Sequence, residues 1–282
     1  MYFAGLAGHD GGEIIDSPIP HSESKLVKEP VGVVTQITPW NYPLLQASWK
    51  IAPALATGCS LVMKPSEITP LTTIRVFELM EEVGFPKGVI NLVLGKGSEV
   101  GEPLSAHKEV DLVSFTGGIK TGKHIMKQAA DHVTDVALEL GGKNPNVIFD
   151  DADFDLAVDQ ALNGGYFHAG QVCSAGSRIL VHNDIKDKFE KALIERVGKI
   201  KLGNGFDSDT EMGPVISPEH RDKIEKYMKV AKDDGATIAI GGKRPDDEDL
   251  KDGLFFEPTV ITNRDTHMRI VQEEVFGPVV TI

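Results

Sequence analysis

Cysteine and long apolar runs are both scarce in this sequence. Only two cysteines, Cys59 and Cys173, occur among its 282 residues. Two thiols so far apart do not make a disulfide framework, which favours a reducing compartment such as the cytoplasm. The longest apolar run, Ile51 to Met63, is broken by Pro53 and Gly58 and predicts no membrane span. No charged segment followed by an apolar one precedes it, so the sequence also predicts no signal peptide.

Positive charge and metal-ligand motifs are lacking as well. The chain has 29 Lys and Arg against 42 Asp and Glu, which gives a formal net charge of −13. A phosphate backbone or an acidic membrane surface would be repelled, so we expect no nucleic-acid or membrane partner. The nine histidines are scattered, without an H-E-x-x-H or paired Cys/His spacing, so no metal site is predicted.

What the sequence does contain is an alternation of strand-like and helical patterns, typical of an α/β fold with parallel strands. Its length suggests about two domains. The strands are predicted at 32–37, 60–64, 89–94, 110–115, 178–181, 237–240 and 255–261. The helices are predicted at 43–57, 70–83, 121–130, 154–162, 186–201 and 218–232, with Thr69 and Ser217 as N-caps. The polar segment 12–30 has three prolines and is interpreted as an extended arm or hairpin.

Both ends of the sequence lie inside expected elements. Residues 1–7 resemble the end of an apolar helix, and residues 279–282 an unfinished strand without a turn after it. We therefore expect the chain to be cut at both ends.

Two glycine-rich turns, at 95–101 and 116–118, each follow a predicted strand and precede a helical pattern. Glycine lets a backbone approach a phosphate closely, and a helix N-terminus attracts negative charge. The first turn, G-x-G-x-x-x-G, is one residue longer than the Rossmann fingerprint, and glycine can also serve such turns for its positive φ alone. A phosphate site and a purely structural role both stay open.

A carboxylate and a thiol stand in two further short segments, Glu139 in 138–143 and Cys173 in 170–176. A thiol among small residues, with a carboxylate that can act on water, can form a thioester and then hydrolyse it. The alternatives are a buried structural cysteine and a solvated turn glutamate. A cysteine hydrolase or acyltransferase with His168 as its base is also open.

Six motifs occur in the order and approximate spacing of one enzyme family. They are Pro39-Trp40-Asn41-Tyr42-Pro43, Lys64-Pro65-Ser66-Glu67, Phe115-Thr116-Gly117-Gly118, Glu139-Leu140-Gly141-Gly142-Lys143, Gly170-Gln171-Val172-Cys173 and Glu274-Val275-Phe276-Gly277-Pro278. Nearly the whole chain thereby resembles the NAD(P)-dependent aldehyde dehydrogenases, and most closely their betaine aldehyde branch.

The resemblance implies a domain organisation. It places the end of a truncated helix at 1–11, an oligomerisation arm at 12–30, a Rossmann-type NAD-binding domain at 31–142 and an α/β catalytic domain at 143–282. It also implies that the N-terminal part of the cofactor domain and the C-terminal part of the catalytic domain are missing. An inactive nucleotide-binding fragment is therefore a further alternative.

The resemblance also implies catalytic roles. Cys173 would be the nucleophile that adds to the aldehyde carbon, and Asn41 would donate to the oxyanion together with the Cys173 amide. After hydride leaves for the nicotinamide, Glu139 would activate water to hydrolyse the thioester. Lys50 matches a lysine that in the family takes part in proton relay, and a surface lysine is the alternative interpretation.

For the cofactor, the resemblance favours NAD, because Glu67 would bind a free ribose 2′-hydroxyl and repel a 2′-phosphate. Gly118 stands where the family often has serine, which removes one side-chain contact to phosphate. Potassium is associated with the betaine branch. The implied cofactor residues are Thr38, Trp40, Lys64, Ser66, Glu67, Gly97, Gly101, Phe115, Gly117, Gly118, Thr121, Leu140, Glu274 and Phe276.

The expected substrate is a small aldehyde, with Tyr42, Trp49 and Gln171 as its contacts. Aromatic faces bind quaternary ammonium groups, so Tyr42 and Trp49 on one helix would suit betaine aldehyde and its oxidation to glycine betaine. Both could equally be ordinary apolar residues. The full-length protein is expected to be a homo-oligomer, a dimer or a tetramer.

Overall fold

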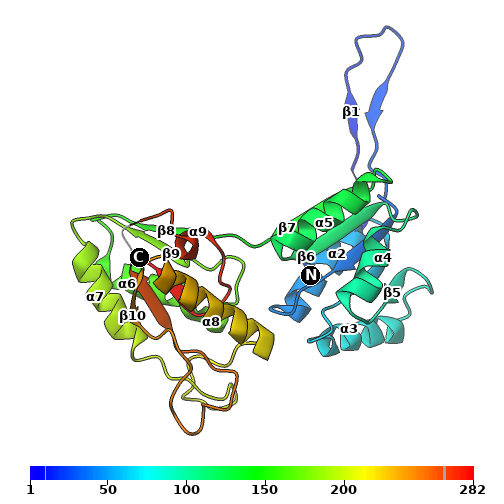
Figure 1. The fold of residues 1–282 in the computed structure, drawn as a ribbon. Helices are drawn as coiled ribbons and strands as arrows, with labels where there is room; N and C mark the ends of the chain where they lie inside the picture. Colours follow the sequence, from blue (N-terminus) through cyan, green and yellow to red (C-terminus); the bar gives the residue numbers. More distant parts are fainter. Residues whose placement is uncertain (10, 263–264) are drawn as a thin grey trace. The chain divides into compact units, whose positions relative to one another are not determined.

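A computed structural model describes residues 1–9, 11–262 and 265–282 of the chain. The chain divides into two compact units, Met1–Leu140 and Gly141–Ile282 (Figure 1). The units therefore divide after residue 140, two residues before the domain boundary that the family resemblance implies after residue 142. Each unit has its own five-stranded sheet.

The sheet of the first unit is entirely parallel, in the order β5-β4-β3-β6-β7. Its strands are β3 (Val33–Ile37), β4 (Ser60–Lys64), β5 (Ile90–Leu92), β6 (Leu112–Gly117) and β7 (Asp135–Leu140). The chain adds β4 and β5 on one side of β3 and then β6 and β7 on the other. The order therefore reverses between β3 and β6, and ligands of such sheets bind at the carboxyl ends beside this point.

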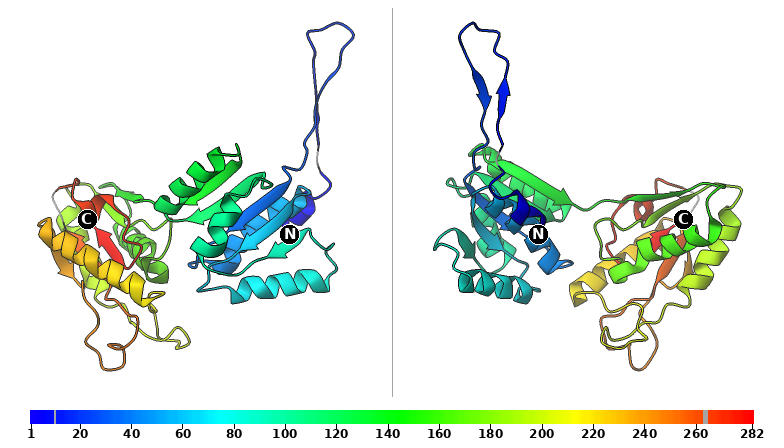
Figure 2. Two further views of the ribbon diagram at one scale, coloured as in Figure 1. Left: turned by 45° about the vertical axis from the view of Figure 1, so that its right-hand side comes forward. Right: turned by 180° about the vertical axis from the view of Figure 1, so that it is seen from behind.

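Helices cover both faces of this sheet. Val34, Leu61 and Met63 pack with α2 (Pro43–Ala56) and α3 (Leu71–Glu82) on one face. Val113 and Phe115 pack with α5 (Ile119–Ala130) on the other face. Figure 2 shows the green α5 and the cyan α3 on opposite sides of the strands. Two short helices, α1 (Tyr2–Leu6) and α4 (Glu102–Ser105), and a π-helical turn, Gly97–Gly101, complete the unit with the arm.

The structure corrects three predictions in this unit. Thr69 is not a cap, because α3 begins after Pro70 without a side-chain cap and Thr69 Oγ1 has no hydrogen-bond partner among the described residues. Gly117 belongs to β6, so the second turn begins at Gly118. Finally, β7 was not predicted, and Glu139 lies in this strand and not in a turn.

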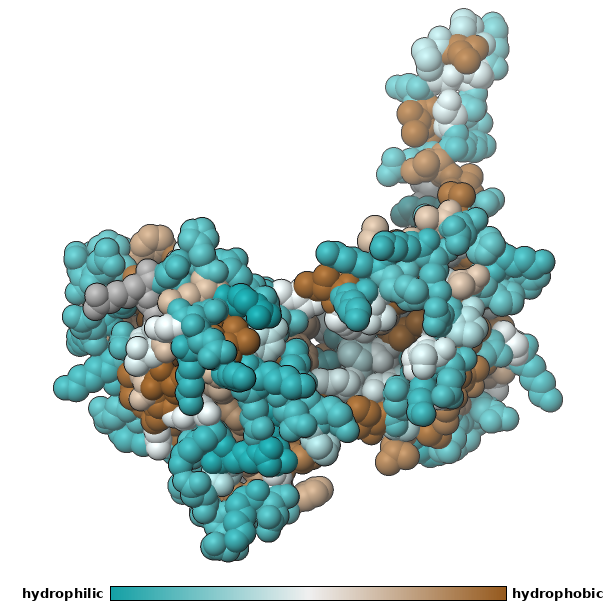
Figure 3. Space-filling view, viewed as in Figure 1, coloured by the Kyte–Doolittle hydropathy of each residue, from teal (hydrophilic) through white to brown (hydrophobic). Residues whose placement is uncertain are grey.

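The predicted arm is a hairpin of β1 (Glu13–Ile15) and β2 (Ser24–Leu26), which pair antiparallel as a separate two-stranded sheet. Its apolar side chains Ile14, Ile15 and Leu26 are exposed. Figure 3 shows apolar groups along the hairpin among hydrophilic ones.

The second unit has the strand order β10-β11-β12-β9-β8. Its strands are β8 (Pro145–Ile148), β9 (Arg178–Val181), β10 (Thr237–Ile240), β11 (Thr259–Thr262) and β12 (Val279–Thr281). All pairs are parallel except β10 with β11. The expectation of parallel strands is wrong for β10, because no helix connects it to β11 and a parallel neighbour needs a long crossover. Strand β8 was also missed.

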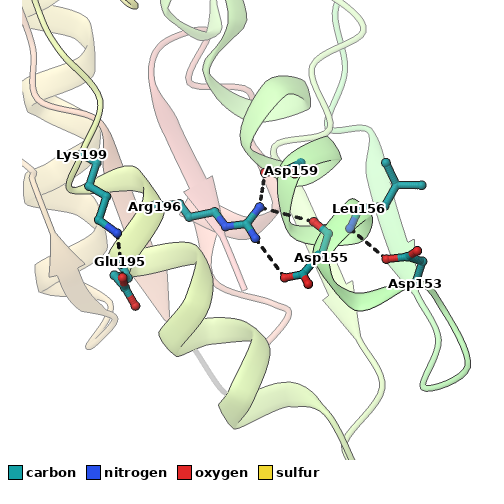
Figure 4. A network of polar contacts seen from close by, with 7 residues as sticks. All are labelled: Asp153, Asp155, Leu156, Asp159, Glu195, Arg196 and Lys199. Carbon is teal, nitrogen blue, oxygen red and sulfur yellow. Dashed lines mark hydrogen bonds and ion pairs between the residues drawn. The ribbon is translucent and has the colours of Figure 1, made fainter.

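Four α-helices are described in this unit, α6 (Phe154–Tyr166), α7 (Lys186–Val197), α8 (Pro218–Asp233) and α9 (Arg269–Gln272), with a 3₁₀ turn at Phe167–Gly170. Ser217 caps α8 as predicted, since its Oγ accepts from the amide of His220 at 3.2 Å. Figure 4 shows that Arg196 of α7 binds Asp155 and Asp159 of α6. Beneath these ion pairs the core includes the fully buried Phe189, Leu193, Ile224 and Val280.

Among the described residues, no helix combines the length and the apolar character that crossing a membrane requires.

Candidate active site

A cavity of about 290 Å³ opens in the first unit where the glycine turn meets α5. Four residues predicted from the sequence, Gly97, Gly101, Phe115 and Thr121, line it. The cavity also has a polar wall that was not predicted from the sequence, formed by Glu102, Ser105, His124 and Gln128. Ser105 Oγ lies 3.0 Å from Gln128 Oε1, and Glu102 Oε1 lies 3.2 Å from His124 Nε2 and 3.3 Å from Gln128 Nε2. These residues lie on α4 and α5, and no motif in the sequence brings them together.

Lys64 and Glu67 form a contact at the carboxyl end of β4. Lys64 is 2% exposed, and its Nζ donates to Pro65 O at 3.0 Å and to Glu67 Oε2 at 3.4 Å. The Glu67 carboxylate is about half exposed and can accept hydrogen bonds from a ligand. Ser66 beside them is buried. The two residues predicted to bind the ribose are therefore neighbours in space.

Buried hydroxyls at the same edge lack partners. Thr38 Oγ1 and Thr116 Oγ1 make no hydrogen bond within the described part of the chain. Gly118 is the N-cap of α5, and a Cβ on it would meet no atom within 4 Å, so the fold has room there for the serine often found in the family. Gly117 is different, because a Cβ there would lie 2.5 Å from the Phe115 ring. The cavity, the unpaired hydroxyls and the open helix N-terminus fit a dinucleotide.

Asn41, Lys50 and Glu139 belong to the same unit. Asn41 is 5% exposed and comes just before α2, while Lys50 lies on α2. Lys50 is 8% exposed, so the surface interpretation is wrong. Its Nζ donates to Ser114 Oγ at 2.9 Å. Burial lowers the pKa of Lys50 from 10.5 to about 8, against the opposing field of Glu139.

Cys173 is half-buried on a loop of the second unit. Asn144 Nδ2 donates to the Cys173 carbonyl at 2.7 Å and to the Ala175 carbonyl at 3.4 Å. The amide of Gly176 donates to Gly164 O of α6 at 3.0 Å. These hydrogen bonds therefore hold the loop at Cys173 and on the C-terminal side of the thiol. Asn144 was not among the site residues predicted from the sequence.

Glu274 and Phe276 line a small hollow together with Gly170, Val172 and Ala175 of the cysteine loop. The structure therefore places these two predicted cofactor residues beside the loop that carries the thiol. Phe276 has a positive φ of 61°, and its carbonyl lies 2.6 Å from His220 Nε2. Because a carbonyl only accepts, Nε2 must carry a proton.

Glu274 accepts a hydrogen bond from the Gly142 amide at 3.2 Å. Burial raises the pKa of this carboxyl, while the Gly142 amide, Lys223 and Lys143 act in the opposite direction. Burial also lowers the pKa of Lys143 to about 8. The partly buried Glu274 carboxylate is therefore surrounded by a hydrogen-bond donor and two lysines, which offset part of the cost of its burial.

The three predicted substrate residues differ in environment. The expectation that Tyr42 and Trp49 lie on one helix is wrong for Tyr42, because α2 begins at Pro43 and Tyr42 is its N-cap, while Trp49 is 59% exposed within the helix. Gln171 is buried, and its side chain donates to His168 O and accepts from the Ile216 amide. Leu140, predicted to contact the cofactor, packs against Gly122 of α5. Trp40 is half-buried directly before Asn41.

Asp150, His182 and Asp184 bring three potential ligand atoms within 4.8 Å of one another on exposed loops of the second unit. Exposed groups of this kind are common without a metal. The expectation of potassium stays a prediction.

Known proteins resemble this chain along its whole length. The chain is 65% identical over 282 residues to betaine aldehyde dehydrogenase of Bacillus subtilis, covering 100% of the chain and 58% of that protein. It is 46% identical over 268 residues to aminoaldehyde dehydrogenase 2 of Pisum sativum, covering 95% of the chain and 53% of that protein. A crystal structure of betaine aldehyde dehydrogenase from Staphylococcus aureus with NAD⁺ matches with a TM-score of 0.98 and 86% identity, covering 100% of this chain and 56% of that one.

The chain thus spans a little over half the length of these relatives. The pattern of one family, the aldehyde dehydrogenases, matches residues 1–282. The chain therefore belongs to the aldehyde dehydrogenase family.

Proposed function

We propose that the full-length protein, meaning the whole protein in which this chain occurs, oxidises betaine aldehyde to glycine betaine with NAD. The observation that carries the proposal is the match of the entire chain to betaine aldehyde dehydrogenases at 65% and 86% identity. Aminoaldehyde dehydrogenases among the relatives, at 46% identity, make an aminoaldehyde the competing substrate.

The first step is addition of the Cys173 thiolate to the aldehyde carbon. A carbon–sulfur bond forms while the carbonyl π electrons move to oxygen, and the side-chain N–H of Asn41 and the Cys173 amide donate to that oxygen. Asn144 supports the step by binding the carbonyl groups of Cys173 and Ala175, which limits the positions of the thiol. When bound, NAD supplies the acceptor for the hydride that leaves the carbon as the thioester forms.

The second step is hydrolysis of the thioester. Glu139 takes a proton from water, the hydroxide adds to the thioester carbon, and the carbon–sulfur bond breaks to release the acid and the thiolate. Lys50 in its neutral form accepts the proton from Glu139. A pKa of about 8 makes this form accessible near neutral pH, whereas an ordinary lysine would be charged.

For the cofactor, we assign the adenine end to the cavity lined by Gly97 and Gly101 and the adenosine ribose to Lys64 and Glu67. A free 2′-hydroxyl can donate to the Glu67 carboxylate, while a 2′-phosphate would be repelled, so NAD is preferred over NADP. The α5 N-terminus beside Gly118 would hold the pyrophosphate. Glu274 would accept a hydrogen bond from the nicotinamide ribose, and Phe276 would contact the ring.

The hairpin of residues 13–26 suits pairing with a second copy. Exposed Ile14, Ile15 and Leu26 would gain from burial, and two isolated strands have little stability of their own. We therefore propose a homo-oligomer, a dimer or tetramer, of the full-length protein. A cytoplasmic location remains a prediction.

The test is an assay of the purified full-length protein with betaine aldehyde and NAD, in which reduced nicotinamide and glycine betaine are both quantified. Equal amounts of both products support the proposal. Release of acid from a thioester or ester by a protein that forms no reduced nicotinamide from betaine aldehyde and NAD would support the cysteine hydrolase instead. Binding of NAD without any turnover would indicate that the remaining function is nucleotide binding alone.

A further inference from the structure

One face of the first sheet changes from apolar to polar toward the carboxyl ends of its strands. Val34 of β3 packs into the core with α2 and α3. Two residues further along, Gln36 is paired with Ser114 of β6, and beyond them Thr116 is paired with Glu139 of β7. Because side chains alternate along strands, all of these lie on the α2 face. A polar strip thus follows the apolar core at this edge.

Lys50 enters this strip from α2. Its main-chain carbonyl accepts from Gln36 Nε2 at 2.8 Å, and its Nζ donates to Ser114 Oγ at 2.9 Å. Gln36 is 1% exposed, so the bond to the backbone is shielded from water. Lys50 is therefore attached to β3 through its backbone and to β6 through its amine.

The charged surroundings of this amine are sparse. Strands β3 and β6 have no charged residues, and α1 has none. Strand β4 ends with Lys64, which already binds Glu67, and β7 has Asp135 at its opposite end. The charged residues of α3 are all exposed, namely Arg75, Glu78, Glu81 and Glu82. The field that acts on Lys50 comes from Glu139.

A lysine side chain has several rotatable bonds, and ordering it costs entropy unless a partner fixes its end. A serine hydroxyl can do this in both protonation states, since it accepts from an ammonium and donates to a neutral amine. We propose that Ser114 is a positioning residue that holds the Lys50 amine on the face of the sheet that carries Glu139. The inference rests on the proposed role of Lys50 as the acceptor of the proton from Glu139.

The test uses three variants of the full-length protein. Ser114→Ala removes the hydroxyl, and Ser114→Thr keeps it with a residue that suits a strand. Ser48→Ala is the matched control, because Ser48 lies on the same helix and its hydroxyl binds only Leu45 O among the contacts described. The first readout is competitive acetylation of Lys50 across pH, followed by mass spectrometry, which gives the pKa of this amine without any turnover. The second is the pH dependence of thioester hydrolysis.

Loss of a bond that stabilises the ammonium should lower the pKa of Lys50 in Ser114→Ala by roughly one unit. The rise of hydrolysis with pH should move to lower pH by a similar amount, and its plateau should fall several-fold because the amine is less well placed. Ser114→Thr and Ser48→Ala should behave like the wild type.

An unchanged pKa of Lys50 in Ser114→Ala would overturn the inference. So would an equal change in Ser48→Ala. A shifted pKa with an unchanged pH profile of hydrolysis would support Ser114 as the partner of Lys50. The same result would contradict the proposed transfer of a proton from Glu139 to Lys50. A failure of the Ser114 inference can therefore be distinguished from a failure of the proposed proton relay.

Discussion

Asn144 Nδ2 donates to the main-chain carbonyl of Cys173 at 2.7 Å and contacts the carbonyl of Ala175 at 3.4 Å. One amide group therefore spans the turn that carries the thiol. Asn144 directly precedes β8, whose backbone fixes the position from which the side chain reaches the loop. A side chain this short moves little, so it orients the turn.

Asn144→Ala should lower kcat/KM by about 10- to 100-fold, because a displacement of about 1 Å at a reacting atom can cost that much. The affinity for NAD, measured by fluorescence titration, should not change. Asn163→Ala, at an exposed position of α6, is the matched control. Wild-type kcat/KM in Asn144→Ala would assign the residue to stability only.

Cys173→Ala should abolish aldehyde oxidation in the full-length protein and leave NAD binding nearly intact, because the thiol is needed for bond formation and not for the dinucleotide. Steady-state rates and calorimetric NAD titrations provide the two measurements. Turnover within a few-fold of wild type would contradict covalent catalysis.

Glu139→Gln should stop the reaction after hydride transfer, because the amide cannot take a proton from water. We expect a burst of reduced cofactor without steady turnover, and an acyl adduct on Cys173 in the mass spectrum. Asp135→Asn, on the same face of β7, should turn over normally. A linear time course at the normal rate in Glu139→Gln would leave that residue with a structural role.

Lys50→Met should stabilise the protein at neutral pH by about 1–3 kcal/mol, because it removes a charge buried at a cost. The pKa of Lys50 is about 8 in the fold and 10.5 ordinarily. Below pH 8, Lys50 is charged in both the folded and the unfolded protein, so the full cost of burying this charge destabilises the fold. Between pH 8 and 10.5, Lys50 has lost its proton in the folded protein and still keeps it in the unfolded protein, so the stability of the wild type rises with pH.

The stability advantage of Lys50→Met should therefore be largest below pH 8 and shrink toward 10.5, which denaturant unfolding at a series of pH values can measure. Lys96→Met, at an exposed lysine, should change little at any pH. A constant difference between Lys50→Met and wild type across this range would show that the charge of Lys50 is not the cause.

Trp49→Ala should reduce the preference for betaine aldehyde over its uncharged isostere, 3,3-dimethylbutanal. A quaternary ammonium cannot donate hydrogen bonds, and an aromatic face contributes on the order of 0.5–2 kcal/mol to its binding. The measurement is the ratio of kcat/KM values for the two aldehydes, with Leu45→Ala on the same helix as control. Equal values in the wild type would exclude an aromatic cation site and leave a general aldehyde dehydrogenase.

The sequence by itself determined the elements with strong local signals. The short apolar runs at β4, β9 and β10 predicted the bounds of these strands, and Ser217 before Pro218 marked the start of α8. Local patterns predict such elements because the cause lies within a few residues of the chain. The order and spacing of the six motifs likewise identified the family, because both can be read from the sequence without knowing how the chain packs.

Only the tertiary structure decided the surroundings of the reactive groups. The bonds from Asn144 to Cys173 and from Lys50 to Ser114 join residues 29 and 64 positions apart, and the burial that lowers the pKa of Lys50 comes from a helix packed on a sheet. Strand β7 is different, because its exposed and half-buried residues alternate as in a strand that is buried on one face, so a local pattern for it is present in the sequence. Contacts between distant segments and the loss of solvent depend on packing, which no local pattern encodes.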